Sequence, residues 1–100
     1  MTRSKLTDEL FKWAHRHEQE LTSRGIECSC TSSSIDAQAS ARIDLSSDSI
    51  MARATVWDAG YCDVEAVSVE SGEQTYYEHM EILEHDALVY TLDKLLDLFQ

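Results

Sequence analysis

The chain contains no proline and only three glycines in 100 residues. Three glycines are too few for a phosphate-cradling loop, so the common nucleotide-binding fingerprints are excluded. No run of about 18 apolar residues is present, and a membrane-spanning helix is therefore not expected. The amino-terminal residues also lack the unbroken apolar stretch of a signal peptide. These absences predict a cytoplasmic protein that does not bind a membrane.

Cysteine is also scarce, with Cys28, Cys30 and Cys62 as its three occurrences. An odd number of cysteines without a signal peptide indicates free thiols in a reducing compartment. The Cys28-x-Cys30 spacing is shorter than that of a zinc-binding pair. On a strand these two residues would share one face, where we expect them to serve as small buried hydrophobic residues.

Basic residues are few, and they are rarest in the second half of the chain. Nineteen acidic residues face eight basic ones, which gives a net charge of −11. Residues 54–100 contain eleven acidic residues and a single basic one, Lys94. Such a domain repels nucleic acids and anionic membranes, and it attracts a basic protein. Solubility alone is the alternative explanation of this charge.

The length and the periodicity predict a single domain over residues 1–100. Apolar residues at helical spacing predict a first helix over 5–24, with Ser4 or Thr7 as its cap and Gly25 as its end. A second helix is expected from about Asp86 to Phe99, with Asp86 as its cap.

Between the two helices the period changes to two, which is typical of strands. The predicted strands cover 26–30, 39–45, 50–57, 61–69 and about 74–82. Residues 31–34 and 46–49 are polar and turn-like, while Gly60 and Ser71-Gly72 favour hairpin turns. Short connections favour antiparallel neighbours. We therefore predict an α+β two-layer sandwich, in which both helices pack on one face of an antiparallel sheet of four to five strands.

No residue pattern points to an active site. The serines lack the G-x-S-x-G context of a nucleophile. His15 and His17 diverge on a helix and cannot easily chelate one ion. The carboxylates alternate along exposed strands, where nothing desolvates one of them to raise its pKa. We therefore predict no enzyme activity and assign no catalytic, cofactor-binding or metal-binding residue, with His79 beside Glu65 or Glu81 as the alternative of a small hydrolase.

The exposed sheet face is the candidate interaction surface. If Ala52, Ala54 and Val56 face the helices, Trp57 and its neighbours face outward. Aromatic anchors ringed by charge are typical of protein-binding hot spots. An ordinary cross-strand packing role for Trp57 is the alternative. For the fourth strand, a bulge that turns Val67 and Val69 inward remains open.

The sequence resembles the TriTu family of bacterial immunity proteins. The resemblance covers roughly residues 9–99, and its most specific part is Val56-Trp57-Asp58-x-Gly60-x-x-Asp63-x-Glu65 followed by Ser71-Gly72-Glu73-Gln74. Taken together, the sheet face and this motif predict partner contacts at Trp57, Asp58, Tyr61, Asp63, Glu65, Tyr77, His79 and Glu81.

The resemblance implies an inhibitor of a toxin used in contact-dependent growth inhibition. Its partner would be the basic, C-terminal nuclease domain of the toxin, which resembles tRNA-cleaving effectors that recruit elongation factor Tu. An acidic domain suits such a partner, because its carboxylates can replace the phosphates of RNA. A small acidic adaptor or secretion chaperone is the alternative of another class.

Overall fold

The computed structural model describes residues 5–35, 38–82 and 84–99. Within these residues the chain forms two short helices, five strands and a final helix. The elements are α1 (Leu6–Arg16), α2 (Glu18–Ser23), β1 (Glu27–Ile35), β2 (Gln38–Ser46), β3 (Ile50–Trp57), β4 (Tyr61–Ser68), β5 (Gln74–Glu81) and α3 (His85–Asp97). The predicted order of helix, strands and helix is confirmed.

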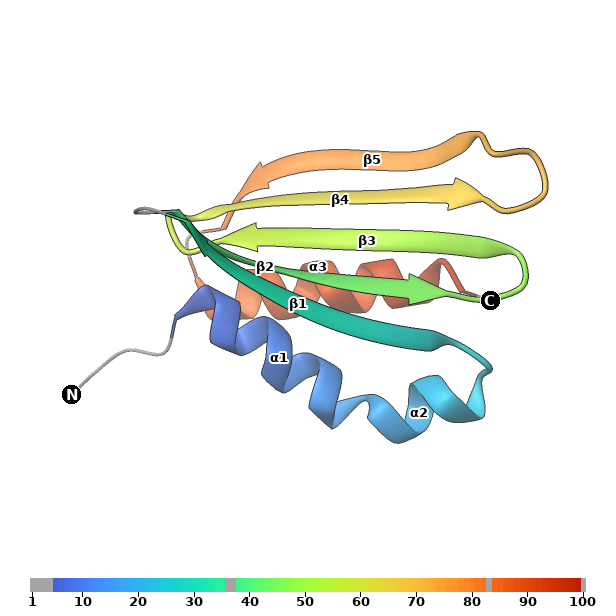
Figure 1. Cartoon of the computed structure of the whole chain (residues 1–100), viewed down its shortest axis with the longest axis horizontal. Coiled ribbons are helices and arrows are strands. Elements are labelled where there is room, and N and C mark those ends of the chain that lie inside the picture. Colours follow the sequence, from blue (N-terminus) through green and yellow to red (C-terminus); the bar gives the residue numbers. More distant parts are fainter. Residues whose placement is uncertain (1–4, 36–37, 83, 100) are drawn as a thin grey trace.

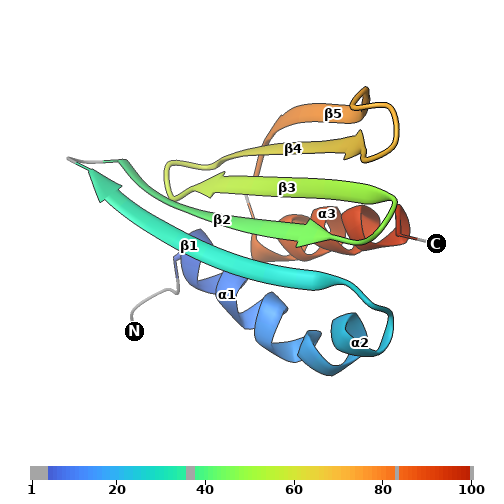
Figure 2. The ribbon, with the colours of Figure 1, turned by 45° about the vertical axis from the view of Figure 1, so that its right-hand side comes forward.

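The five strands form one antiparallel sheet in which each strand pairs with its neighbour in the sequence. Figures 1 and 2 show the helices on the same side of this sheet. The opposite side, called here the outer face, carries none of the described helices. The predicted two-layer α+β sandwich is therefore confirmed, with five strands.

The core lies between the sheet and the helices. Ala52, Ala54 and Val56 are buried along β3, and the intervening positions are at least partly exposed. The helices contribute a matching set of fully buried side chains, namely Leu10, Trp13, Leu21, Leu88, Leu92 and Leu95. Burial of this apolar surface is the main favourable term in folding. It also fixes the register, because a shift by one residue would turn the apolar side of each strand to solvent.

The first helix differs from the prediction, because the expected helix over 5–24 divides at His17 into α1 and α2. The His17 ring stacks on Trp13, with 4.2 Å between ring centroids, and its Nδ1 lies 2.9 Å from the Trp13 carbonyl oxygen. Gly25 ends α2 as predicted. Its φ of 71° allows the backbone N–H of Ile26 to donate to the Leu21 carbonyl oxygen.

Two expected helix caps are corrected. Thr7 lies inside α1, where it is held by Asp58, and the Ser4 alternative lies outside the described residues. Asp86 lies in the first turn of α3, and Glu84 occupies the N-cap position without a side-chain hydrogen bond. The carboxylate of Asp86 still opposes the helix dipole from the first turn.

Strand β1 is longer than predicted. The turn expected over 31–34 is wrong, because these residues pair with β2 in register, from Thr31 opposite Arg42 to Ser34 opposite Ala39. The backbone hydrogen bonds between β1 and β2 hold these residues in a strand, although their polar side chains are typical of a turn. In β4, Val67 pairs with Met51 on the outer face, so the inward alternative for Val67 is wrong. The register shift lies between β4 and β5 instead.

Candidate partner-binding surface

The register of the sheet brings the predicted outward residues together across three strands. Trp57 of β3 lies opposite Tyr61 of β4, and Tyr61 in turn lies opposite Glu81 of β5. In the neighbouring rows, Asp63 pairs with His79, and Glu65 pairs with Tyr77. We call this set the acidic–aromatic face; it consists of Trp57, Tyr61, Asp63, Glu65, Tyr77, His79 and Glu81.

The aromatic side chains of this face are accessible to a partner. Tyr77 is 55% exposed and Tyr61 is 44% exposed, although both are large apolar rings. Trp57 is half-buried at the end of β3. The predicted inward and outward assignment of these strands is therefore confirmed, while a role in binding stays a prediction.

A shallow recess lies at one end of the face. It has a volume of about 380 Å³ and is lined by Ala39, Trp57, Ala59, Tyr61 and His79. The two alanines leave room beside the rings, and sequence patterns did not single them out. Ala39 comes from β2 and Ala59 from the β3–β4 turn, so only the folded sheet assembles the recess.

His79 is held on the face by two contacts. Its ring stacks against Tyr61, with 5.9 Å between centroids and 15° between planes. Its Nδ1 hydrogen-bonds to the Asp63 carboxylate. The carboxylate beside His79 is thus Asp63, which corrects the expected pairing with Glu65 or Glu81. The cause is the register, which places Asp63 directly opposite His79.

Charge is distributed unequally over the outer face. On β2 and β3 the basic side chains are matched, because Asp44 forms ion pairs with Arg53 at 2.7 Å and with Arg42 at 3.3 Å. Strands β4 and β5 supply no lysine or arginine of their own, since residues 61–81 contain neither. The acidic–aromatic face is therefore the strongly negative half of the sheet.

Asp58 differs from the other predicted binding residues. It lies in the β3–β4 turn, and its carboxylate reaches the amino-terminal end of α1. The backbone N–H of Thr7 donates to Oδ1 at 2.9 Å, and the Thr7 hydroxyl donates to Oδ2 at 3.4 Å. These bonds satisfy one of the free N–H groups at a helix start. The structure therefore gives Asp58 a role in joining the helix layer to the sheet.

The cysteines occupy two different environments. Cys62 is buried in the core, and burial raises the pKa of its thiol to about 12. Cys28 is exposed and Cys30 is only half-buried, so the prediction that both are buried is wrong. They lie on the edge strand, where the helix layer does not cover them fully. The pKa of the Cys28 thiol is lowered mainly by a hydrogen bond from Cys30, and the same bond raises the pKa of Cys30.

The remaining histidines lie apart from this surface. His15 faces Glu18 at 3.8 Å, and His85 faces Glu9 at 3.4 Å. Within residues 5–35, 38–82 and 84–99, no group of three or more His, Cys, Asp or Glu side chains has the arrangement of a metal site. The helices of the same residues lack the length and apolar character of a membrane span.

Comparison with known proteins identifies the family. A family model described as "Immunity protein TriTu" matches residues 8–98, which include the whole acidic–aromatic face. No match was found among the curated proteins. The matched segment covers nearly the whole chain, from α1 through α3. The chain therefore belongs to the TriTu family of immunity proteins.

Proposed function

We propose that this immunity protein neutralises a nuclease toxin by covering its basic, RNA-binding cleft with the acidic–aromatic face. The toxin would be the C-terminal domain of a contact-dependent growth inhibition system. Its substrate would be tRNA, with elongation factor Tu as a further component of the toxin complex. Family membership supports a cognate toxin as the partner.

The observation that carries this proposal is the combination of charge and aromatic surface on β4 and β5. Asp63, Glu65 and Glu81 stand on the same face as Tyr61 and Tyr77. A cleft that holds RNA presents arginine and lysine side chains to phosphates. Carboxylates on a rigid sheet can take the place of those phosphates, and the rings supply the apolar anchors of a hot spot.

Inhibition is proposed to proceed by binding, without turnover. The Asp63–His79 pair is the acid–base couple of the acidic–aromatic face. Its side chains are 34% and 53% exposed, respectively. A general acid or base is tuned by removal from water, and this pair is in contact with water. The observation favours an interaction role for His79 over the alternative of a small hydrolase.

The adaptor or secretion-chaperone alternative requires a long apolar groove for an unfolded segment. The outer face of β3 and β4 instead intersperses the charged residues Arg53, Asp63 and Glu65 among its aromatic and apolar side chains, which include the Met51–Val67 pair. Because the proposed target is tRNA, we place the action of the protein in the cytoplasm of the cell it protects.

The toxin domain encoded beside this protein provides the test. The two would be co-expressed, purified together, and assayed for tRNA cleavage over a range of molar ratios. We expect growth to be rescued, a complex to be isolated at moderate salt, and cleavage to cease near one immunity protein per toxin. Failure to form a complex would overturn the proposal. Complete inhibition at far lower ratios would indicate that the protein acts as an enzyme.

A further inference from the structure

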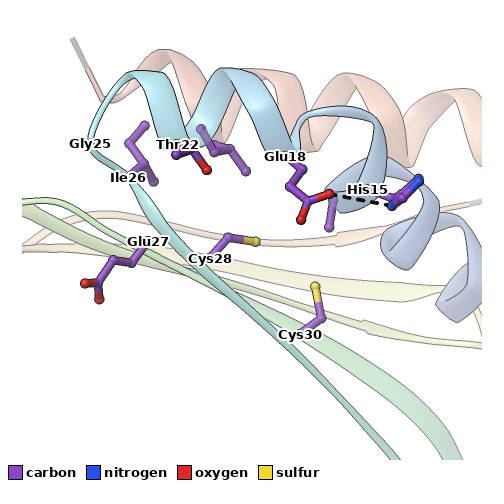
Figure 3. A pocket seen from close by; sticks show the side chains of 10 residues that line it. His15, Glu18, Thr22, Gly25, Ile26, Glu27, Cys28 and Cys30 are labelled. Carbon is purple, nitrogen blue, oxygen red and sulfur yellow. Dashed lines mark ion pairs between the residues drawn. The ribbon is translucent and has the colours of Figure 1, made fainter.

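The second notable site lies on the other side of the molecule, at the edge of the sheet. Cys28 and Cys30 of β1 pair with Leu45 and Ile43 of β2, whose side chains are buried on the helix side. Both thiols therefore project toward α1 and α2. Figure 3 shows the two sulfur atoms on the same side of β1, below the helices.

The thiols open into a pocket. It has a volume of about 760 Å³ and lies between the end of α1, α2 and the start of β1. Its lining includes Cys28, Cys30, His15 and Glu18. Cys28 is exposed, so a small solute or an ion reaches the sulfur atoms from solvent without unfolding the sheet.

The strand holds the two thiols in a geometry unsuited to a disulfide. Residues two apart on a strand have parallel side chains about 6.6 Å apart at their bases. A disulfide requires Cβ atoms about 3.8 Å apart, so β1 would have to bend away from β2 to form one. An ion bound between the two sulfur atoms spans a longer distance than a direct S–S bond, so β1 can stay paired with β2.

The surrounding charge decides which class of ligand the site suits. The carboxylate of Glu18 lines the pocket together with Cys28 and Cys30 and adds negative charge beside the sulfur atoms. His15, at the rim, is positioned beside Glu18. This field attracts a cation, and it disfavours an anionic adduct such as a mixed disulfide with a carboxylate-bearing thiol.

The number of sulfur ligands narrows the choice of cation. Zinc in structural sites is almost always four-coordinate, whereas the described residues supply no cluster of three or more ligating side chains here. Soft thiolate ligands suit copper(I), zinc and iron–sulfur clusters, and of these copper(I) is the one that two sulfur ligands can hold. We propose that Cys28 and Cys30 form a two-thiolate site for a soft monovalent cation of the copper(I) class. On binding, one ion replaces the two thiol protons, which pass to the solvent, and no electron is transferred.

The test is a competition titration on the full-length, reduced protein under anaerobic conditions. Copper(I) would be supplied from a complex with a coloured copper(I) chelator, and its transfer to the protein followed by absorbance. We expect one ion per monomer. Each of Cys28→Ser and Cys30→Ser should weaken binding by about 100-fold or more, because the second sulfur then no longer acts at high effective concentration.

Cys62→Ser is the matched control, since Cys62 is buried on β4 and faces the core. We expect this variant to bind copper(I) as tightly as the unchanged protein. Circular dichroism on all three variants would verify that serine leaves the fold intact. The proposal is overturned if Cys28→Ser or Cys30→Ser keeps its copper(I) affinity within about threefold of the unchanged protein. It is also overturned if Cys62→Ser loses as much copper(I) affinity as these two variants, or if one ion is shared by two chains. Inhibition of the toxin is measured in a separate experiment, so the result of the copper(I) titration neither supports nor contradicts the proposed function.

Discussion

The carboxylate of Asp58 holds the first turn of α1 across 51 positions of the sequence. The N-cap residue of that helix, Lys5, offers no side-chain hydrogen bond of its own. The bond from Asp58 therefore supplies from the β3–β4 turn what a serine or aspartate usually supplies from the N-cap position. Asp58, which the sequence motif predicted as a partner contact, thus stabilises the internal structure.

Asp58→Ala should lower the free energy of unfolding by about 1 to 2 kcal/mol, because the Thr7 N–H loses its acceptor. Urea unfolding followed by circular dichroism would measure the change. Asp48→Ala is the matched control, since Asp48 is exposed in the β2–β3 turn. A loss for Asp58→Ala no larger than that of the control would show that the bond contributes nothing.

Single residues of the acidic–aromatic face were predictable where the alternation was regular. Trp57, Tyr77 and Glu81 were expected outward, and the register places them there. The partner of His79 was not predictable, because it depends on which β4 residue lies opposite. The exposure of Cys28 was missed for a similar reason: a two-residue period identifies a shared face and does not reveal how far a helix covers it.

At the scale of elements, the β3–β4 turn positions one end of the acidic–aromatic face. Gly60 has a φ of 108°, and its carbonyl accepts the backbone N–H of Ile82 at 2.7 Å. The turn therefore holds the start of β4 and the residue after β5 together. Any side chain at position 60 would be strained, because L-residues rarely adopt this φ.

Gly60→Ala should destabilise the protein by about 1 to 3 kcal/mol, the range for a residue held in a sparsely populated conformation. Gly25→Ala is the matched comparison. Its φ of 71° lies close to the left-handed region that L-residues can reach, and a Cβ there meets nothing within 4 Å. We expect the smaller loss for Gly25→Ala, measured by urea unfolding. The reverse order would contradict the strain assigned to Gly60.

The elements with regular apolar patterns were predicted closely, and those without were not. Strand β3 has the predicted bounds of 50–57, because its alternation is unbroken. The end of β1 is rich in serine, and its strand conformation depends on pairing with β2, which no local pattern reveals. The interruption at His17 was missed because its apolar stripe continues from α1 into α2.

At the scale of the whole molecule, the net charge of −11 should act on the rate at which the toxin is captured. The negative half of the sheet would steer a basic partner toward the acidic–aromatic face before contact. Such steering depends on charge–charge attraction at long range, which dissolved salt screens effectively. The charge therefore raises the association rate and favours basic partners, while the aromatic side chains slow the dissociation of the complex.

Raising the salt concentration should slow association by about tenfold or more and change the dissociation rate much less. Stopped-flow fluorescence with the toxin domain would measure the two rates separately. A variant carrying Glu65→Gln and Glu81→Gln serves as the comparison, and its association should be slower and less sensitive to salt. An association rate of the unchanged protein that is independent of salt would refute the role given to its charge.

The central claim is that the toxin binds the acidic–aromatic face, and two aromatic substitutions test it most directly. Trp57 lies on that face, whereas Tyr90 is 65% exposed on α3 in the opposite layer. Calorimetric titration of the toxin domain with Trp57→Ala should show a loss of at least about 2 kcal/mol in binding free energy, or roughly 30-fold in affinity. Tyr90→Ala should bind as the unchanged protein does. Full affinity for a folded Trp57→Ala, together with a large loss for Tyr90→Ala, would place the toxin on the helix layer and contradict the account.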